Sequence, residues 1–543
     1  MTSSQTPISA ESPTSGFFVR NATGLVREVS WLDAAMYNMI WASVPLAIAF
    51  LLLFGTAFYA GGNLYLACVF AFLVTVTTGF LYAMMTAIIP RSGGDYTWIS
   101  RTLSPPLGFM SNVSWNFWIT FFVGLYAAYT TAYGLSPLLR LWAARTGSPG
   151  LLSAANYLDT RSGTLIVGLA VVLLSALLLA FGRGLRAFLR IQRWTFVLWV
   201  LGAMLIPIIV LLVTSKATVF ARFDHYVSAL GGPRHASALV LKNGATANAP
   251  FSLRESFLML TQPFYALAFI FQSVYFGGEI KRAKRSGILS IPGAHVIATI
   301  LIMLATVAFL TGAGHGFLAG LALTSPGAYK FAFTPLYTEI AAVASGNIVV
   351  GTIIILGFTS MLIIFVTQTM LQLSRNIFAW SFDHLLPDKV AEISERSRAP
   401  IVAIAAITGA SVISVVIVSL NPQLTFLVGL VGLCLTYLIV SVAGMVLPYR
   451  KRELFEASPY NRRIRGIPVL TLVAGGSFVL MAVAMTNLLL DPNSGTNWHL
   501  NTNRVILVLA IFVVALPIFY VIRAIQRRRG INIDLAYTVI PPE

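Results

Sequence analysis

Charged residues are scarce in this chain, and that scarcity excludes most classes of soluble protein. Only 10% of the 543 residues are Asp, Glu, Lys or Arg, whereas 57% are hydrophobic. Soluble globular domains usually carry about 25% charged and about 45–50% apolar residues. The composition therefore excludes an ordinary soluble enzyme, a disordered protein and a nucleic-acid-binding domain. It predicts a protein with several membrane spans.

Cysteine and histidine are also rare. The two cysteines, Cys68 and Cys434, lie inside apolar runs, so no disulfide framework is expected. No two of the six histidines show metal-ligand spacing, and a glycine-rich phosphate loop is missing. These absences argue against a metalloenzyme and an ATP-driven pump. We predict that the protein is not an enzyme and carries no cofactor, apart from a possible coupling ion.

Long apolar runs dominate what is present. A bilayer core of about 30 Å requires about 20 apolar residues in a helix. Twelve stretches meet this requirement: 34–58, 64–89, 109–139, 165–181, 195–213, 256–276, 291–312, 348–373, 401–420, 424–447, 469–490 and 505–522. Their apolar residues are continuous rather than alternating, which predicts an all-α polytopic membrane protein with twelve transmembrane helices.

The basic residues give the orientation. Lysine and arginine number 36 against 18 Asp and Glu, and most of the basic residues fall in alternate loops. Cytoplasmic loops of membrane proteins accumulate Lys and Arg. The pattern predicts a multi-pass protein of the plasma (inner) membrane with both termini in the cytoplasm. The lipid bilayer and a small solute are the expected partners, nucleic acid is not, and the oligomeric state is open.

Polar residues at membrane depth are uncharged. The central parts of the spans contain no Asp, Glu, Lys or Arg, which removes the carboxylate relay that pumps commonly use. The first span carries Pro45 and the sixth carries Pro263. Interrupted helices at matching positions of two repeats indicate the substrate site in many transporters. Serine, threonine and asparagine at depth also often hold helices together, so each residue alone indicates little.

Three motifs at span ends carry a family resemblance. They are Pro-Arg-Ser-Gly-Gly-Asp-Tyr at 90–96, Gly-Glu-Ile-Lys-Arg at 278–282, and Ser-Arg-Asn-Ile-Phe-Ala at 374–379 followed by Asp-His-Leu-Leu-Pro at 383–387. Together, in this order, they resemble the amino acid–polyamine–organocation (APC) superfamily of permeases, of the amino acid permease type. The resemblance covers roughly residues 19–450.

The resemblance implies a LeuT-type fold with a five-plus-five inverted repeat and two additional helices. The organisation expected from it comprises an N-terminal segment at 1–32, a first repeat at 33–215, an extracellular loop at 216–255, a second repeat at 256–448, a basic loop at 449–468, spans eleven and twelve at 469–522, and a tail at 523–543. The tail beyond residue 530 has no apolar periodicity and is expected to be mobile.

The resemblance also implies a site midway across the membrane, at unwound parts of spans one and six. The residues expected to contact substrate are Asn38, Trp41, Ser43, Pro45, Leu46, Ala47, Ile48, Thr120, Tyr265, Ala266, Ala268, Phe269 and Gln272. Glu279 and Asp383 are each either a solvated ion pair or part of a cytoplasmic gate. Many relatives have glycines where this chain has residues 45–49 and 265–269, which makes a non-amino-acid substrate credible.

The coupling ion is open between sodium, proton and none. Span five lacks the lysine that makes some relatives proton-linked, and span eight carries the hydroxyl pair Thr359 and Ser360 as a possible sodium site. The leading hypothesis is a secondary-active transporter of a neutral amino acid. An aromatic cage of Trp41, Tyr265 and Phe269 would instead suit an amine or polyamine through cation–π contact. A channel, or a sensor that binds without transport, is the alternative of another class.

Overall fold

The computed structural model describes residues 28–182, 185–281, 283–394, 399–420 and 427–538, without the side chains of 283–285 and 427–428. Most of the predicted N-terminal segment and the end of the predicted tail lie outside these residues, as do Arg183, Arg396 and Arg398 of the predicted cytoplasmic loops. The described chain is almost entirely helical.

The helices are α1 (Trp31–Trp41), α2 (Val44–Phe50), α3 (Thr56–Phe58), α4 (Leu64–Ile88), α5 (Asp95–Thr102), α6 (Pro105–Tyr129), α7 (Ser136–Thr146), α8 (Pro149–Leu158), α9 (Arg161–Phe181), α10 (Leu185–Trp199), α11 (Ile206–Val213), α12 (Lys216–Ala229), α13 (Ala236–Gly244), α14 (Leu253–Leu258), α15 (Thr261–Leu267), α16 (Ala283–Gly312), α17 (His315–Leu323), α18 (Tyr337–Ser345), α19 (Ile348–Phe382), α20 (Ile401–Leu420), α21 (Leu427–Arg450), α22 (Arg452–Glu456), α23 (Val469–Leu490) and α24 (Thr502–Arg528). Strands β1 (Arg463–Ile464) and β2 (Ile467–Pro468) form a short antiparallel hairpin.

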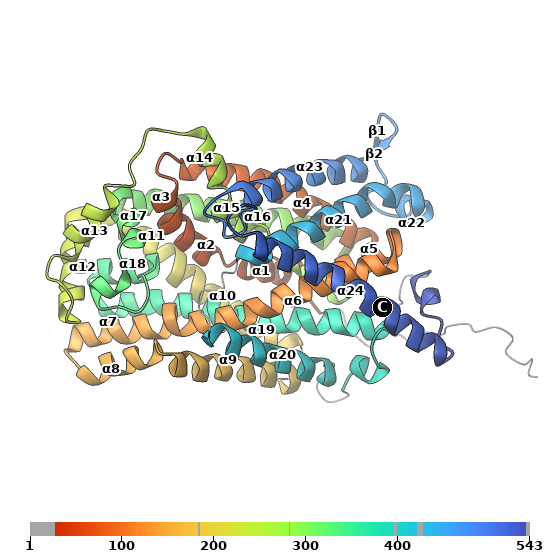
Figure 1. The fold of residues 1–543 in the computed structure, drawn as a ribbon, viewed down its shortest axis with the longest axis horizontal. Coiled ribbons are helices and arrows are strands. Elements are labelled where there is room, and N and C mark those ends of the chain that lie inside the picture. Colours follow the sequence, from red (N-terminus) through yellow and green to blue (C-terminus); the bar gives the residue numbers. More distant parts are fainter. Residues whose placement is uncertain (1–27, 183–184, 282, 395–398, 421–426, 539–543) are drawn as a thin grey trace, which may run out of the picture.

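The long helices run side by side along the longest axis of the molecule (Figure 1). Helix α4 packs against α16 and α23, and α6 packs against α19, α20 and α24. We call the end of the bundle with α5, α22 and Ile533–Tyr537 the terminal face. The opposite end, with α8, α12, α13 and α17, is the distal face.

Ten helices of the described chain are long and apolar enough to cross a membrane. Large apolar side chains on them point outward, where lipid would cover them, as at Leu174 and Phe181 of α9. The prediction of an all-α polytopic membrane protein is confirmed. The other two predicted spans lie in α6–α7 and in the interrupted segment α14–α15. The twelve-span count and the inverted-repeat topology stay predictions.

Local sequence signals place the helix ends. Ser30 and Asp33 form a capping box at the start of α1, where each side chain bonds to the backbone N–H of the other residue. Asn63 caps α4 and Asn347 caps α19: each side chain accepts hydrogen bonds from backbone N–H groups of the first turn. Pro105 stands in the first turn of α6, where a helix tolerates the missing N–H.

The end of the chain contradicts the expectation of a mobile tail. A 3₁₀ turn at Ile533–Tyr537 packs onto the terminal face, and Ile533 and Ala536 are completely buried there. Tyr537 is hydrogen-bonded to Tyr96 of α5 through the two hydroxyl groups (3.1 Å). Isolated apolar residues in a tail carry no periodicity that would predict such packing, so composition alone misses it.

Candidate functional site

The first span is interrupted between α1 and α2. Ser43 adopts a left-handed conformation (φ 47°, ψ 47°) and is fully buried. A non-glycine residue in this region costs about 1–3 kcal/mol and persists only where surrounding structure imposes it. Pro45 follows in the first turn of α2. The predicted break in this span is confirmed, and the missing glycine is replaced by a strained serine.

The sixth span is interrupted after Leu267, where α15 ends. Turns and two short 3₁₀ segments, Gln272–Tyr275 and Gly277–Glu279, replace the helix as far as the start of α16. The break thus begins inside the predicted range 265–269. Both interruptions are fully buried, which places backbone without regular helical bonding at the centre of the bundle.

Aromatic side chains from four spans meet beside the two breaks. Trp41 stacks on Phe269 with ring centroids 5.9 Å apart, and it meets Phe365 of α19 edge to face at 4.8 Å. Tyr265 lies 6.0 Å from Phe269, and its hydroxyl is 3.0 Å from that of Tyr126 on α6. We call Trp41, Tyr126, Tyr265, Phe269 and Phe365 the aromatic box. The structure thus brings together the three residues of the predicted cage.

Buried polar groups border this aromatic box. Asn38 Oδ1 accepts a hydrogen bond from the backbone N–H of Ser273 (2.8 Å), and Gln272 Oε1 accepts one from Gln372 (3.0 Å). One buried donor, Asn38 Nδ2, remains without a partner, whereas Trp41 Nε1 and Gln272 Nε2 face the hydroxyls of Tyr37 and Tyr437 without ideal hydrogen-bond geometry. A buried unpaired donor costs about 1–3 kcal/mol, so such groups indicate a place where a ligand or water binds.

The structure gives less support to solute contact by the other predicted residues, most of whose polar groups are already bonded within the protein. The backbone N–H groups of Leu46 and Ala47 both donate to the Ser43 carbonyl, so neither is free for a substrate carboxylate. The Ala268 carbonyl accepts from Tyr437 (2.7 Å). Thr120 is bonded back to its own helix. Pro45, Ile48 and Ala266 are buried in α2 and α15. Their roles stay predictions.

The predicted sodium ligands bond within their own helix. Thr359 Oγ1 donates to the Ile355 carbonyl (2.7 Å), and Ser360 Oγ donates to the Gly357 carbonyl (2.8 Å). Thr359 packs against the third span, because a Cβ atom at Gly134 would stand 2.7 Å from Thr359 Oγ1.

The hydroxyl pair lies level with the break in the first span, because α19 runs antiparallel to α1: Tyr37 bonds to Gln368, and Trp41 meets Phe365. No described oxygen of the first span bonds to Thr359 or Ser360. A hard cation needs several oxygen ligands, and two hydroxyls are too few. The two hydroxyls alone do not complete a sodium site, and the sodium site stays a prediction.

Glu279 forms a buried ion pair at the terminal face. Its carboxylate accepts two hydrogen bonds from the Arg375 guanidinium, 2.7 and 3.1 Å long. Its carbonyl accepts from the backbone N–H groups of Glu28 and Val29, ahead of α1. A partner of Glu279 therefore comes from the eighth span. The pair is dry, and it joins the ends of spans one, six and eight.

Asp383 forms a second buried pair there. It bonds to Arg101 of α5 (2.7 Å) and accepts from the hydroxyl of Tyr96 (2.8 Å). Gly94, ahead of α5, has φ +48°, and a Cβ atom there would stand 3.0 Å from the ring of Tyr275. Glycine is needed because α5 begins in contact with the interrupted sixth span. Both predicted gate residues thus lie in closed, dehydrated contacts.

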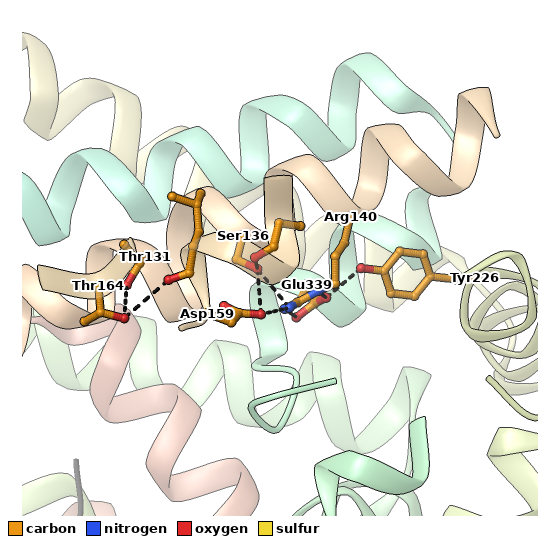
Figure 2. Close-up of polar contacts among 9 residues, drawn as sticks. Thr131, Ser136, Arg140, Asp159, Thr164, Tyr226 and Glu339 are labelled. Atoms are coloured by element: carbon orange, nitrogen blue, oxygen red, sulfur yellow. Dashed lines mark hydrogen bonds and ion pairs between the residues drawn. The ribbon is translucent and has the colours of Figure 1, made fainter. Parts of the chain in front are cut away.

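A third buried ionic cluster lies at the distal face (Figure 2). Arg140 of α7 pairs with Asp159 (2.9 Å) and with Glu339 of α18 (3.3 Å), and the Tyr226 hydroxyl of α12 donates to Glu339 (2.6 Å). Ser136 donates to Asp159. Burial raises the pKa of Asp159 to about 6, with Arg140 opposing the shift.

Sequence reasoning missed several residues of these clusters. Tyr126 and Phe365 complete the aromatic box, but aromatic residues are common in every span, so no pattern distinguishes them. Arg375 stands inside the third motif and Arg101 follows the first by five residues, so both could have been paired with Glu279 and Asp383 by charge. Two cavities of about 480 and 610 Å³ lie among distal-face segments, and no predicted substrate residue lines either.

The comparison with known families agrees with this architecture. A family model described as "Amino acid permease" matches residues 32–521, which is most of the chain. The chain belongs to the amino acid permease family. No curated protein matches the chain significantly. The permease family consists of transporters, so the protein is a multi-pass membrane transporter that contacts the lipid bilayer and small solutes, and the family gives no support to an enzyme.

Proposed function

We propose that this permease moves a neutral amino acid, or an organic solute of similar size, across the plasma membrane by alternating access. The aromatic box and the unpaired amide nitrogen of Asn38 beside it support this proposal most directly. The box and its bordering residues contain no Asp, Glu, Lys, Arg or His, so the site suits a solute without net charge, which needs no counter-ion. The terminal face is the cytoplasmic face in this proposal, because the basic loops lie on that side of the predicted topology.

An organic amine is the second candidate, and the aromatic box favours it. Ring faces attract a cation, with about 0.5–2 kcal/mol per contact. Trp41 and Phe269 are stacked and could sandwich an ammonium group if they separated. Neutral amino acids remain the first candidate because no buried carboxylate accompanies the rings.

The test begins with ligand-induced thermal stabilisation of the purified protein against neutral amino acids, amines and nucleobases. A ligand that binds only the folded state stabilises it by mass action. Active ligands are then tested for counterflow in proteoliposomes. Binding without counterflow would identify a sensor and contradict transport.

Asn38→Asp then separates the two candidates. This change retains the oxygen that Ser273 bonds and replaces the unpaired donor with negative charge. We expect neutral solutes to bind about tenfold more weakly, which corresponds to about 1.4 kcal/mol, while cationic amines gain affinity. Asn63→Asp, at the cap of α4, adds the same charge at a position where Asp caps equally well. Equal effects of both variants would contradict a solute site at Asn38.

Coupling to sodium through Thr359 and Ser360 stays a prediction. Replacement of sodium by choline in uptake measurements at fixed pH tests it.

A further inference from the structure

Buried carboxylates at the terminal face are paired with arginines in three cases. Asp33 bonds to Arg193 at 2.6 Å, Glu279 bonds to Arg375 at 2.7 Å, and Asp383 bonds to Arg101 at 2.7 Å. Each arginine offsets the cost of removing a carboxylate from water. These pairs show how this part of the protein compensates a buried carboxylate.

Asp95 is the exception. It is completely buried at the start of α5 and accepts from the hydroxyl of Tyr275 (2.6 Å) and from the amide of Asn112 (3.3 Å). The ionisable groups that face it from the neighbouring spans are the phenols of Tyr82, Tyr275 and Tyr437, which are neutral. Among the described side chains, no lysine, arginine or histidine bonds to it.

Two opposing effects act on this carboxyl group. A chain of amides donates toward it, from Asn376 to Asn116 (2.6 Å), from Asn116 to Asn112 (3.2 Å), and from Asn112 to Asp95. These bonds favour the ionised form. Burial without a cation favours the neutral form and is the larger effect, so the pKa of Asp95 is raised to about 6. The group is thus close to the range of cellular pH.

Asp95 also ties α5 to the interrupted sixth span. Besides the bond from Tyr275 to Asp95, the backbone N–H of Gly93 donates to the Tyr275 carbonyl (3.0 Å), and Ser92 pairs with Phe276 as an isolated bridge. Opening the terminal face would require this segment to leave α5. Water would then reach Asp95, and the group would ionise as an ordinary aspartate.

We propose that Asp95 is a proton-binding site of the transport cycle, which takes up a proton on acidification while the terminal face is closed and releases it to the aqueous phase on that side when the face opens. The proposal rests on the function proposed above. Opening would return the pKa from about 6 to the ordinary aspartate value of about 3.9. Lowering the pH from 7 to 5 then shifts the equilibrium about tenfold toward the closed terminal face.

The first experiment measures protonation without transport. Infrared difference spectra of the purified protein between pH 7.5 and pH 5 report the C=O stretch of neutral carboxyl groups. We expect part of this band to be lost in Asp95→Asn and retained in Asp33→Asn. Asp33 is a matched control because its carboxylate is buried like that of Asp95 but is paired with an arginine. That arginine, Arg193, is 56% exposed. An unchanged band in Asp95→Asn overturns the proposal.

A second variant covers the case in which Asp95→Asn does not fold. Tyr275→Phe keeps the ring but removes a donor that favours the ionised carboxylate. The midpoint of the infrared titration should therefore move to higher pH. A midpoint that stays in place or moves to lower pH overturns the assignment to Asp95.

The last experiment connects protonation to transport. Counterflow in proteoliposomes should slow several-fold between pH 7 and pH 5 in the wild-type protein and much less in Asp95→Asn. Equal pH dependence in both proteins shows that the proton site is outside the cycle and overturns the proposal. Absence of counterflow at every pH, with an intact infrared titration, instead contradicts the transport function and with it the cycle.

Discussion

Tyr265 links α15 to α6 inside the aromatic box, and its contacts are of two kinds. Its ring packs against Phe269, whereas its hydroxyl meets that of Tyr126. A solute that enters the box has to displace or share these contacts. Packing and solute binding can therefore be separated at this single side chain.

We predict that Tyr265→Ala weakens uptake far more than it lowers stability. Loss of a large buried ring costs about 3–5 kcal/mol of unfolding free energy wherever it lies. Phe309→Ala removes a buried ring from α16, away from the box, and serves as the comparison. Both variants should lower the melting temperature by similar amounts, while only Tyr265→Ala abolishes most of the uptake. Parallel loss of uptake in both would mean that Tyr265 acts through packing.

A second prediction at this scale concerns Thr359 and Ser360. If sodium drives transport through them, replacing sodium with choline at fixed pH should abolish most uptake in the wild-type protein. Uptake by the double variant, Thr359→Ala with Ser360→Ala, should then be low and should not depend on sodium. Their hydroxyls donate to carbonyls of α19, so the same change should cost little stability. Full sodium independence of the wild-type protein would end the sodium hypothesis.

At the scale of elements, the breaks could be predicted and the ion pairs could not. Proline removes a backbone donor at a fixed place in the chain, so Pro45 and Pro263 located both interruptions to within a few residues. The partner of Glu279 is 96 residues away in sequence, and only the packing of α19 brings Arg375 to it. The residue in the strained left-handed conformation is Ser43 rather than a glycine, and no rule of composition predicts this choice.

The buried ionic cluster at the distal face (Figure 2) holds several elements together, because it joins α7, α12, α18 and the segment ahead of α9. We predict that Asp159→Asn makes stability less dependent on pH. The pKa of Asp159 is about 6 in the folded protein and about 3.8 in an unfolded chain, so folding disfavours ionisation of this carboxyl group. The contribution of Asp159 is fully present below about pH 4 and is lost as pH rises through about 6.

Melting temperatures of the wild-type protein and Asp159→Asn between pH 4 and pH 7 test this prediction. The two curves should converge at low pH, where the wild-type carboxyl is neutral, and the wild type should fall further as pH rises. Asp224→Asn is the control, because Asp224 lies on the same face and bonds only to Ser237. A constant difference between wild type and Asp159→Asn at all pH values would contradict a titration at this site.

At the scale of the whole molecule, the end of the chain closes the terminal face. The Arg101 guanidinium lies 5.0 Å from the ring centroid of Tyr537, and it also pairs with Asp383. Asp534 bonds to Arg523 and Arg527, which folds the segment back along α24. The last described residues therefore cover the contact that a cytoplasmic gate would have to break.

Truncation after Gly530 should therefore destabilise the closed state and speed its opening. Burying Ile533 and Tyr537 contributes about 1.5–3 kcal/mol each, partly offset by the entropy of ordering the segment, so we expect a net loss of about 2 kcal/mol. Counterflow should become faster if opening of the terminal face limits the rate. Truncation after Thr538 removes only 539–543 and is the control. Slower counterflow with a lower melting temperature would show that the segment supports the fold without closing the gate, whereas faster counterflow at reduced stability requires that it does both.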